Sequence, residues 1–117
     1  MKLAIIGSRS LKIDNLEKYI PCDVTEIVSG GAKGIDKIAA EYARKKNIRL
    51  TEFLPDFKHY GRAAPLKRHE QIARYSDCAL AFWDCKSKGT EYTINCFRRL
   101  NKSVMVIKIE AKTPFDA

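Results

Sequence analysis

The sequence has 117 residues, of which 45% are hydrophobic and 31% are charged, and its formal net charge is +8. This length fits a single domain over residues 1–117, and the composition excludes a disordered or low-complexity chain. The longest apolar runs are far shorter than the ~20 residues of a membrane helix, so we expect a cytoplasmic protein without membrane contact, and the basic surplus favours anionic partners.

In chain order, the hydrophobic patterns predict strands that alternate with helices. The predicted strands cover residues 2–6, 26–29, 49–53, 78–83 and 103–109. The predicted helices cover residues 13–20, 32–46, 65–75 and 90–100. Because most of the strands are continuous apolar runs, they favour a parallel sheet covered on both faces. We therefore expect an α/β fold with a doubly wound, five-stranded parallel sheet in the order 3-2-1-4-5.

The cysteine spacing bears on metals and disulfides. The four cysteines are Cys22, Cys78, Cys85 and Cys96. They lack Cys-x-x-Cys spacing, and two of them lie in or beside apolar runs, so reduced thiols are favoured over zinc ligands or disulfides. We expect neither a metal site nor a cofactor.

The segment Val28–Asp36 runs from a predicted strand through glycines into a predicted helix. Glycine lets the backbone approach a ligand closely, and a helix start offers unpaired N–H groups and the positive end of the peptide dipole. This layout is typical of an anion-binding turn. The alternative is an ordinary strand-to-helix turn in which the glycines serve only backbone geometry.

Doubly wound sheets bind ligands where the strand order reverses, beyond the carboxyl ends of the first and fourth strands. The residues at those ends are Gly7-Ser8-Arg9-Ser10 and Asp84-Cys85-Lys86-Ser87-Lys88-Gly89-Thr90-Glu91. Both segments are small, polar and basic, as an anion site requires. Thr90 would also serve as a helix N-cap, and Asp36 would also complement the dipole of its helix.

Two standard nucleotide motifs are absent from the sequence. Residues 7–12 do not match G-x-G-x-x-G, and the second strand ends in Ser29-Gly30-Gly31 instead of an acid that would hold a ribose, so an NAD dehydrogenase is not indicated. No Gly-Lys-Ser/Thr occurs, so ATP hydrolysis of the Walker type is not indicated either.

Residues 55–64 combine aromatic, basic and glycine residues, a mixture unusual for a simple connection. The aromatic and basic members are Phe57, His59, Tyr60 and Arg62. The segment is interpreted either as a lid over a base or sugar or as a surface connection whose aromatics cover the sheet edge.

The ordered motifs resemble those of the SLOG superfamily, and of its small YspA/YpsA-related proteins in particular. They are Gly7-Ser8-Arg9, Ser29–Asp36, Arg68, and Ala81–Asp84 leading to Ser87–Thr90. The resemblance spans nearly the entire chain and implies a Rossmann-like domain that binds a nucleotide or nucleotide-derived ligand, often as a homo-oligomer. The expected ligand-binding residues are Gly7, Ser8, Arg9, Ser29, Gly30, Gly31, Ala32, Lys33, Gly34, Asp36, Arg68, Asp84, Ser87, Lys88, Gly89 and Thr90.

LONELY GUY-type phosphoribohydrolases, which cleave a nucleotide N-glycosidic bond, are similar at Gly89-Thr90. Their Pro-Gly-Gly is absent here, and Thr93 stands at the position of their catalytic glutamate. Glu91 is a poor substitute, because two residues along a helix rotate a side chain by ~200°. Asp84 or Glu70 would be another general acid, so whether the protein is an enzyme stays open.

DNA-processing protein A, a single-strand DNA binder, has a motif that Ser29–Asp36 resembles closely. The basic surplus favours this alternative, but Phe82 and Trp83 fall inside a predicted buried strand, which leaves Phe57 and Tyr60 as stacking candidates.

The sequence departs from its own branch at His69, where an Arg-Asn pair is usual, and at Cys85, where glycine is common. Our leading hypothesis is a nucleotide-derivative binding module, with Arg9 and Arg68 neutralising a phosphate that the turns at 29–34 and 87–90 hold. Binding of nucleic acid is the alternative partner.

Overall fold

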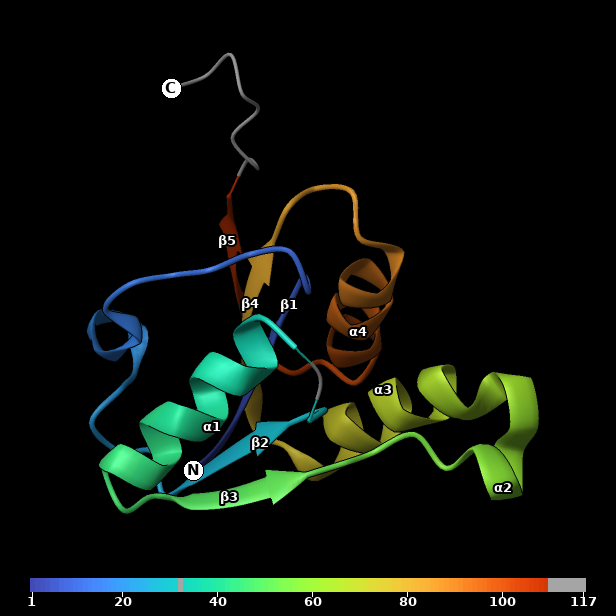
Figure 1. Cartoon of the computed structure of the whole chain (residues 1–117), viewed down its shortest axis with the longest axis horizontal. Helices are drawn as coiled ribbons and strands as arrows, with labels where there is room; N and C mark the ends of the chain where they lie inside the picture. Colours follow the sequence, from blue (N-terminus) through green and yellow to red (C-terminus); the bar gives the residue numbers. More distant parts are fainter. Residues whose placement is uncertain (32, 110–117) are drawn as a thin grey trace.

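The computed structural model describes residues 1–31 and 33–109. Its five strands form one parallel sheet in the order β3-β2-β1-β4-β5, which confirms the predicted topology (Figure 1). The strands are β1 (Lys2–Gly7), β2 (Glu26–Ser29), β3 (Arg49–Glu52), β4 (Cys78–Trp83) and β5 (Val104–Lys108). The helices are α1 (Ile35–Lys45), α2 (Phe57–Tyr60), α3 (Ala64–Tyr75) and α4 (Lys88–Arg99), with 3-10 turns η1 (Leu16–Tyr19) and η2 (Gly61–Ala63).

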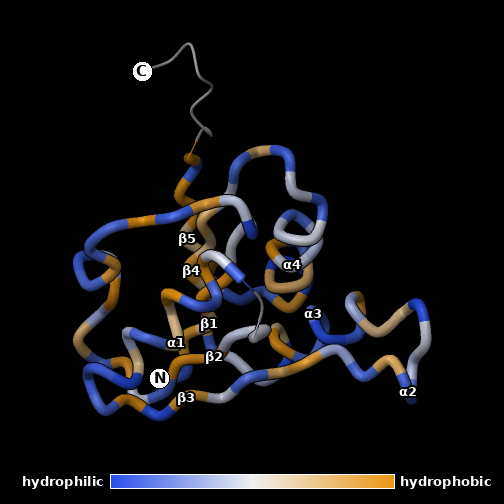
Figure 2. The backbone as a smooth tube through the Cα atoms, in the orientation of Figure 1, coloured by the Kyte–Doolittle hydropathy of each residue, from blue (hydrophilic) through white to orange (hydrophobic). Residues whose placement is uncertain are grey.

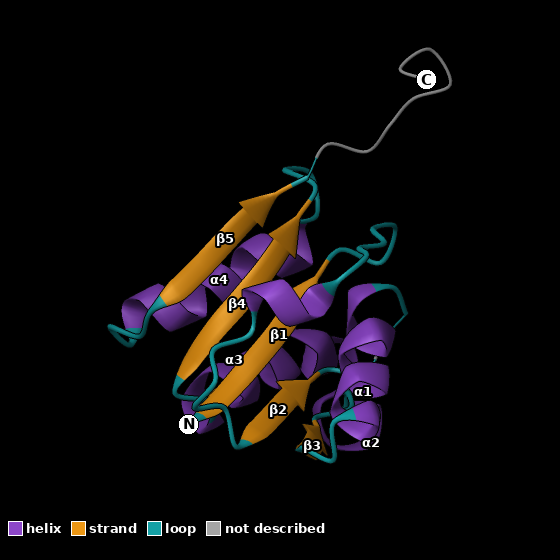
Figure 3. Ribbon diagram, turned by 90° about the vertical axis from the view of Figure 1, so that its left-hand side faces the viewer, coloured by secondary structure: helices purple, strands orange, loops and turns teal. Residues whose placement is uncertain are grey.

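The sheet has a hydrophobic layer on each face. Along β1, Leu3 and Ile5 pack with α1 and η1, whereas Ala4 and Ile6 pack with α3 and α4. Figure 3 shows α3 and α4 behind the strands, and Figure 2 shows hydrophobic stretches along β1, β4 and β5. The helices therefore cover both faces, as expected for alternating strands and helices in a parallel sheet.

The two central strands end level with each other. Gly7 of β1 is paired with Phe82 of β4, and the N–H of Ser8 donates to the carbonyl oxygen of Phe82 at 3.1 Å. Ser8 is also bonded to the loop after β4, because the N–H of Asp84 donates to Ser8 Oγ at 3.3 Å. The loops that follow β1 and β4 are thereby held side by side at the carboxyl edge.

The predicted helices differ from the observed ones mainly at their N-termini. The helix expected over residues 13–20 is only the turn η1, which follows Asn15 in the left-handed region (φ 58°) and buries Leu16 alone. The helix expected from residue 32 begins at Ile35, because the N-cap Gly34 has a φ of 71° and cannot continue the helix backwards. Local sequence patterns do not reveal these backbone conformations.

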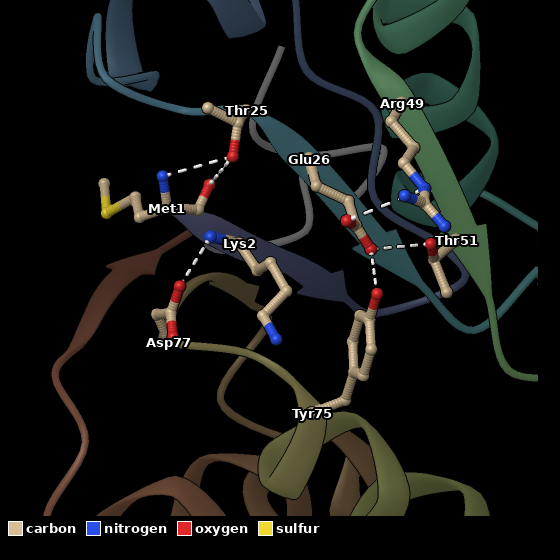
Figure 4. A network of polar contacts seen from close by, with 8 residues as sticks. All are labelled: Met1, Lys2, Thr25, Glu26, Arg49, Thr51, Tyr75 and Asp77. Carbon is tan, nitrogen blue, oxygen red and sulfur yellow. Dashed lines mark hydrogen bonds and ion pairs between the residues drawn. The ribbon is translucent and has the colours of Figure 1, made fainter.

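The amino edge of the sheet holds a buried carboxylate, Glu26 (Figure 4). Glu26 Oε2 accepts hydrogen bonds from Tyr75 and from Thr51, and Oε1 lies 3.8 Å from the guanidinium of Arg49. Burial raises the pKa of Glu26, but these hydrogen bonds and the charges of Arg49 and Lys2 outweigh it, so the pKa lies below its ordinary value. The cluster ties the end of α3 to β2 and β3.

Two further expectations concern membranes and cysteines. Within residues 1–31 and 33–109, no helix combines the length and apolarity that crossing a membrane demands. All four cysteines lie in the described ranges and are free thiols.

Candidate functional site

A cavity of about 470 Å³ opens at the carboxyl edge of the sheet, between the end of β1, the helix α3 and the start of α4. This is where the strand order reverses, and the volume falls in the range of roughly 300–1,000 Å³ typical of ligand pockets. The predicted ligand-binding residues that line the cavity are Gly7, Ser8, Arg9, Gly30, Asp36, Arg68, Asp84, Ser87, Gly89 and Thr90.

Most of the glycine turn between β2 and α1 lies outside this lining. Ser29 is fully buried, and its Oγ accepts the N–H of Gly31 at 3.3 Å. A Cβ at Gly34 would overlap the carbonyl oxygen of Arg9, so Gly34 is the place where the turn packs against the loop after β1. The turn thus has a clear structural role, and among its described residues only Gly30 lines the cavity.

The remaining predicted residues are placed as follows. Lys33 and Lys88 are exposed and do not line the cavity as described, and Ala32 lies outside the described residues. Ligand binding by Ser29, Gly31, Lys33, Gly34 and Lys88 stays a prediction.

Hydrogen bonds shape the loop between β4 and α4 into a tight turn. Asp84 Oδ1 accepts the N–H groups of Lys86 at 2.9 Å and of Ser87 at 2.7 Å, while Trp83 Nε1 donates to the carbonyl oxygen of Ser87 at 3.0 Å. Cys85 has a φ of 64°. The loop therefore needs the left-handed conformation that glycine adopts most easily.

The hydrogen bonds to Asp84 also determine its charge. The N–H of Ser87 contributes most to lowering the pKa of Asp84, and the further bonds outweigh its partial burial. The pKa lies below its ordinary value, so Asp84 is an ionised acceptor at neutral pH.

The first turn of α4 faces the cavity. Ser87, and not Thr90 as considered from the sequence, is the N-cap, and its Oγ accepts the N–H of Thr90 at 3.5 Å. Gly89, the second residue of the helix, lines the cavity and has no side chain to cover its backbone. A helix start of this kind attracts anions through its N–H groups and its dipole.

Arg68 is the main buried cation of the site, with 9% of its surface exposed. Its Nη1 donates to the carbonyl oxygen of Gly30 at 3.2 Å, but its buried Nε has no hydrogen-bond partner among the described residues. Burial and the nearby charge of Arg9 lower the pKa of Arg68, and the carboxylate of Asp36 acts in the opposite direction. Buried donors are nearly always paired, and the unpaired Nε of Arg68 is an exception to this rule.

Several lining residues were not predicted. They are Ile6, Pro65, His69, Ile72 and Thr93, whereas Ser10, which also lines the cavity, belongs to the segment expected at this edge. Three of them share a face of α3 with Arg68, at the spacing i, i+3, i+4 and i+7 from Pro65, so the helical period around Arg68 was the signal that could have found them. His69 matters most, since burial and then the charge of Arg68 lower its pKa to about 4 and leave the imidazole neutral at pH 7.

The candidate general acids do not form a catalytic arrangement in the cavity. Glu91 is exposed and Glu70 accepts a hydrogen bond from Tyr92 at 2.9 Å, and neither lines the cavity as described. Thr93 Oγ1 donates to the carbonyl oxygen of Gly89 at 2.9 Å. Of the three candidate acids, Asp84 lines the cavity, where its ionised carboxylate can accept hydrogen bonds from a ligand.

Within the segment 55–64, α2 and η2 cover residues 57–63, and no residue of the segment is among the described lining of the cavity. No residue of these two elements is buried. Both interpretations of the segment, a lid and a connection that covers the sheet edge, stay predictions.

A comparison with protein families matches residues 11–60, less than half of the chain, to the model of the YspA, cpYpsA-related SLOG family. The SLOG resemblance is confirmed. The matched residues contain the glycine turn between β2 and α1, whereas α3 and α4 lie beyond them. No curated protein and no solved structure matches the chain. The SLOG relationship suggests a nucleotide-related binding role in general terms.

Proposed function

We propose that the cavity at the carboxyl edge binds a nucleotide or a nucleotide-derived ligand through a single phosphate group. The observation that carries the proposal is the convergence of Arg9, Arg68 and the first turn of α4 on one cavity. The basic surplus of the chain agrees with an anionic ligand.

The phosphate is assigned to the rim formed by the loop after β1 and the first turn of α4. Ser8, Arg9, Ser87 and Thr90 line this part and provide hydroxyl and guanidinium donors next to a helix start. Guanidinium groups bind phosphate oxygens in pairs, which adds orientation to the charge attraction.

The nucleoside is assigned to the α3 side of the cavity. Ile6, Pro65 and Ile72 supply apolar surface there, and the neutral imidazole of His69 can donate one hydrogen bond and accept another. This combination suits a base better than a second charged group.

The two carboxylates of the lining select against additional phosphates. Asp84 is ionised, and Asp36 lies within electrostatic reach of Arg68. Carboxylates accept hydrogen bonds from ribose hydroxyls but repel phosphate oxygens. We therefore expect nucleoside monophosphates to bind more tightly than the corresponding triphosphates.

The first experiment is a thermal-shift and calorimetric screen against nucleoside mono-, di- and triphosphates, ADP-ribose-type compounds and NAD, with products checked for released base. A ligand at 100 times its dissociation constant adds about 2.7 kcal/mol to the free energy of unfolding. Stabilisation by a nucleotide without turnover supports a binding module, and released base would make the protein a hydrolase. The absence of any shift would contradict the proposal.

Gly89→Ala is the sharpest variant for this site. The added Cβ would lie 3.5 Å from His69 Nε2, an ordinary contact, and the helical position favours alanine. The fold should persist while the space beside the first turn of α4 is filled, so nucleotide affinity should fall. Asn95→Ala, on an exposed position of the same helix, is the control. Unchanged nucleotide affinity in the Gly89 variant would show that the phosphate does not bind at the first turn of α4.

Gly31, the glycine that the sequence motif points to, does not offer a clean test. Its φ is 69°, and an added Cβ would lie 2.5 Å from Leu54 Cδ2. A side chain there would strain the backbone and displace Leu54, so a loss of binding would not distinguish ligand contact from a local change in the turn. The homo-oligomer implied by the SLOG resemblance stays a prediction, which light scattering tests.

A further inference from the structure

The segment of α2 and η2, which we call the arm (residues 56–63), extends from the sheet at the end of the molecule's longest axis (Figure 1). Its backbone is locally ordered: Asp56 Oδ1 accepts the N–H of His59 at 3.0 Å, and Gly61 with a φ of 55° ends α2. No residue of α2 or η2 is buried. The arm therefore forms a defined surface whose side chains contribute nothing to the hydrophobic core.

The side chains of the arm are aromatic and basic. Phe57 is 60% exposed and Tyr60 is 36% exposed, and both alternate with the exposed residues Lys58 and Arg62. Figure 2 shows hydrophobic and hydrophilic stretches following each other here. Phe57 and Tyr60 stand three residues apart on one helical turn, so their rings expose apolar surface on the same face, where a partner can bind.

The charge of the arm decides among partners. Its acidic residue, Asp56, already accepts a backbone N–H, whereas Lys58 and Arg62 have no ion-pair partner among the described residues. Contact between two copies through this surface would bring like charges together. An anionic partner with flat apolar groups can pair with the basic side chains and stack on the aromatic rings.

We propose that the arm binds single-stranded nucleic acid, with bases stacking on Phe57 and Tyr60 and phosphates contacted by Lys58 and Arg62. Stacking on aromatic faces combined with basic contacts to the backbone is the usual means of binding single strands without sequence preference. The arm site is separate from the cavity, because the described cavity lining contains no residue between Asp36 and Pro65. The proposal therefore does not depend on the proposed nucleotide function.

The test measures fluorescence anisotropy of labelled single-stranded oligothymidine and oligouridine with the full chain. Phe57→Ala and Tyr60→Ala should each weaken binding by at least about fivefold, the lower end of one base–aromatic stack. Their unfolding midpoints should equal that of the wild type, because neither side chain is buried.

The electrostatic half of the proposal has its own variants. Lys58→Gln with Arg62→Gln should lower the slope of log affinity against log salt by about 1.4, since single strands lose about 0.7 per phosphate contact. Arg44→Gln with Lys45→Gln, two exposed residues at the end of α1, removes the same charge elsewhere and should leave the slope unchanged.

Four outcomes would overturn the arm site. The first is that the wild type does not bind the oligonucleotides, and the second is that both aromatic variants bind as tightly as the wild type. The third is that the α1 control lowers the slope of log affinity against log salt as much as the arm variant does. The fourth is that light scattering shows a change of molecular mass in the arm variants that accounts for their weaker binding. Gly89→Ala separates the two proposals, because it should weaken nucleotide binding and leave oligonucleotide binding intact. Equal weakening of both would place the oligonucleotide in the cavity.

Discussion

Arg68 Nη1 donates a hydrogen bond to the carbonyl oxygen of Gly30 at 3.2 Å and thereby joins α3 to the end of β2. The bond uses one nitrogen of a guanidinium whose buried Nε has no partner in the described part of the chain. The Arg68 side chain thus holds α3 to the end of β2 and also lines the cavity. The first prediction tests its role in ligand binding.

Arg68→Lys should weaken nucleotide binding about tenfold or more, because lysine keeps the charge but loses the planar donors, and hydrogen bonds to charged groups contribute about 1.5–3 kcal/mol. Calorimetric titration measures the change, and urea unfolding reports the smaller loss from the Gly30 carbonyl. Arg74→Lys, an exposed change of the same kind on α3, is the control. Wild-type affinity in the Arg68 variant would exclude Arg68 from ligand contact.

Lys102 should stabilise the end of α3. Its Nζ donates to the carbonyl oxygens of Ala73, Arg74 and Ser76 at 2.7, 2.9 and 2.7 Å, and so satisfies acceptors that the end of a helix leaves open. Lys102→Met should lower the free energy of unfolding by about 1–3 kcal/mol. Urea unfolding is the measurement, with the exposed Lys45→Met for comparison; equal effects of the two changes would show that the three hydrogen bonds carry no net stability.

His69 should make stability depend on pH. Its pKa is about 4 in the folded protein against 6.5 for an ordinary histidine, so between these values the unfolded chain binds a proton that the folded chain does not. The free energy of unfolding should fall as the pH drops through this window, by on the order of 2 kcal/mol after allowance for partial exposure. His69→Gln should flatten the profile. If the His69 variant kept the wild-type dependence of the free energy of unfolding on pH, another group would be responsible for it.

Glu26 should make stability fall with falling pH as well, but in a lower pH range than His69. Its pKa lies below the ordinary 4.5, so its contribution is fully present above that value and disappears as the pH falls through the folded-state pKa. Glu26→Gln should cost about 1–3 kcal/mol at neutral pH, because charged hydrogen bonds from Tyr75 and Thr51 are weakened. Chemical unfolding at neutral pH and well below 4.5 tests this, and the difference from the wild type should shrink in acid. Glu41→Gln, exposed on α1, should have no comparable effect.

The parallel sheet, its strand order and its carboxyl-edge loops were predictable because each depends on short-range patterns. Continuous apolar runs predict buried strands, and right-handed crossovers leave few arrangements of alternating strands and helices. The predicted bounds of β2 and β4 agree with the observed Glu26–Ser29 and Cys78–Trp83. Most of the cavity lining follows from this topology, since it is where β1 and β4 end.

The division of roles within the glycine turn depends on contacts between residues far apart in the chain. The packing of Gly34 against Arg9 and of Gly31 near Leu54 results from the positions of whole elements, which no local pattern records. The inclusion of His69 in the cavity likewise depends on how α3 is rotated against the sheet and α4. Local propensity predicts which segments become helices and strands, whereas the packing of side chains between them determines which polar groups are left facing the cavity.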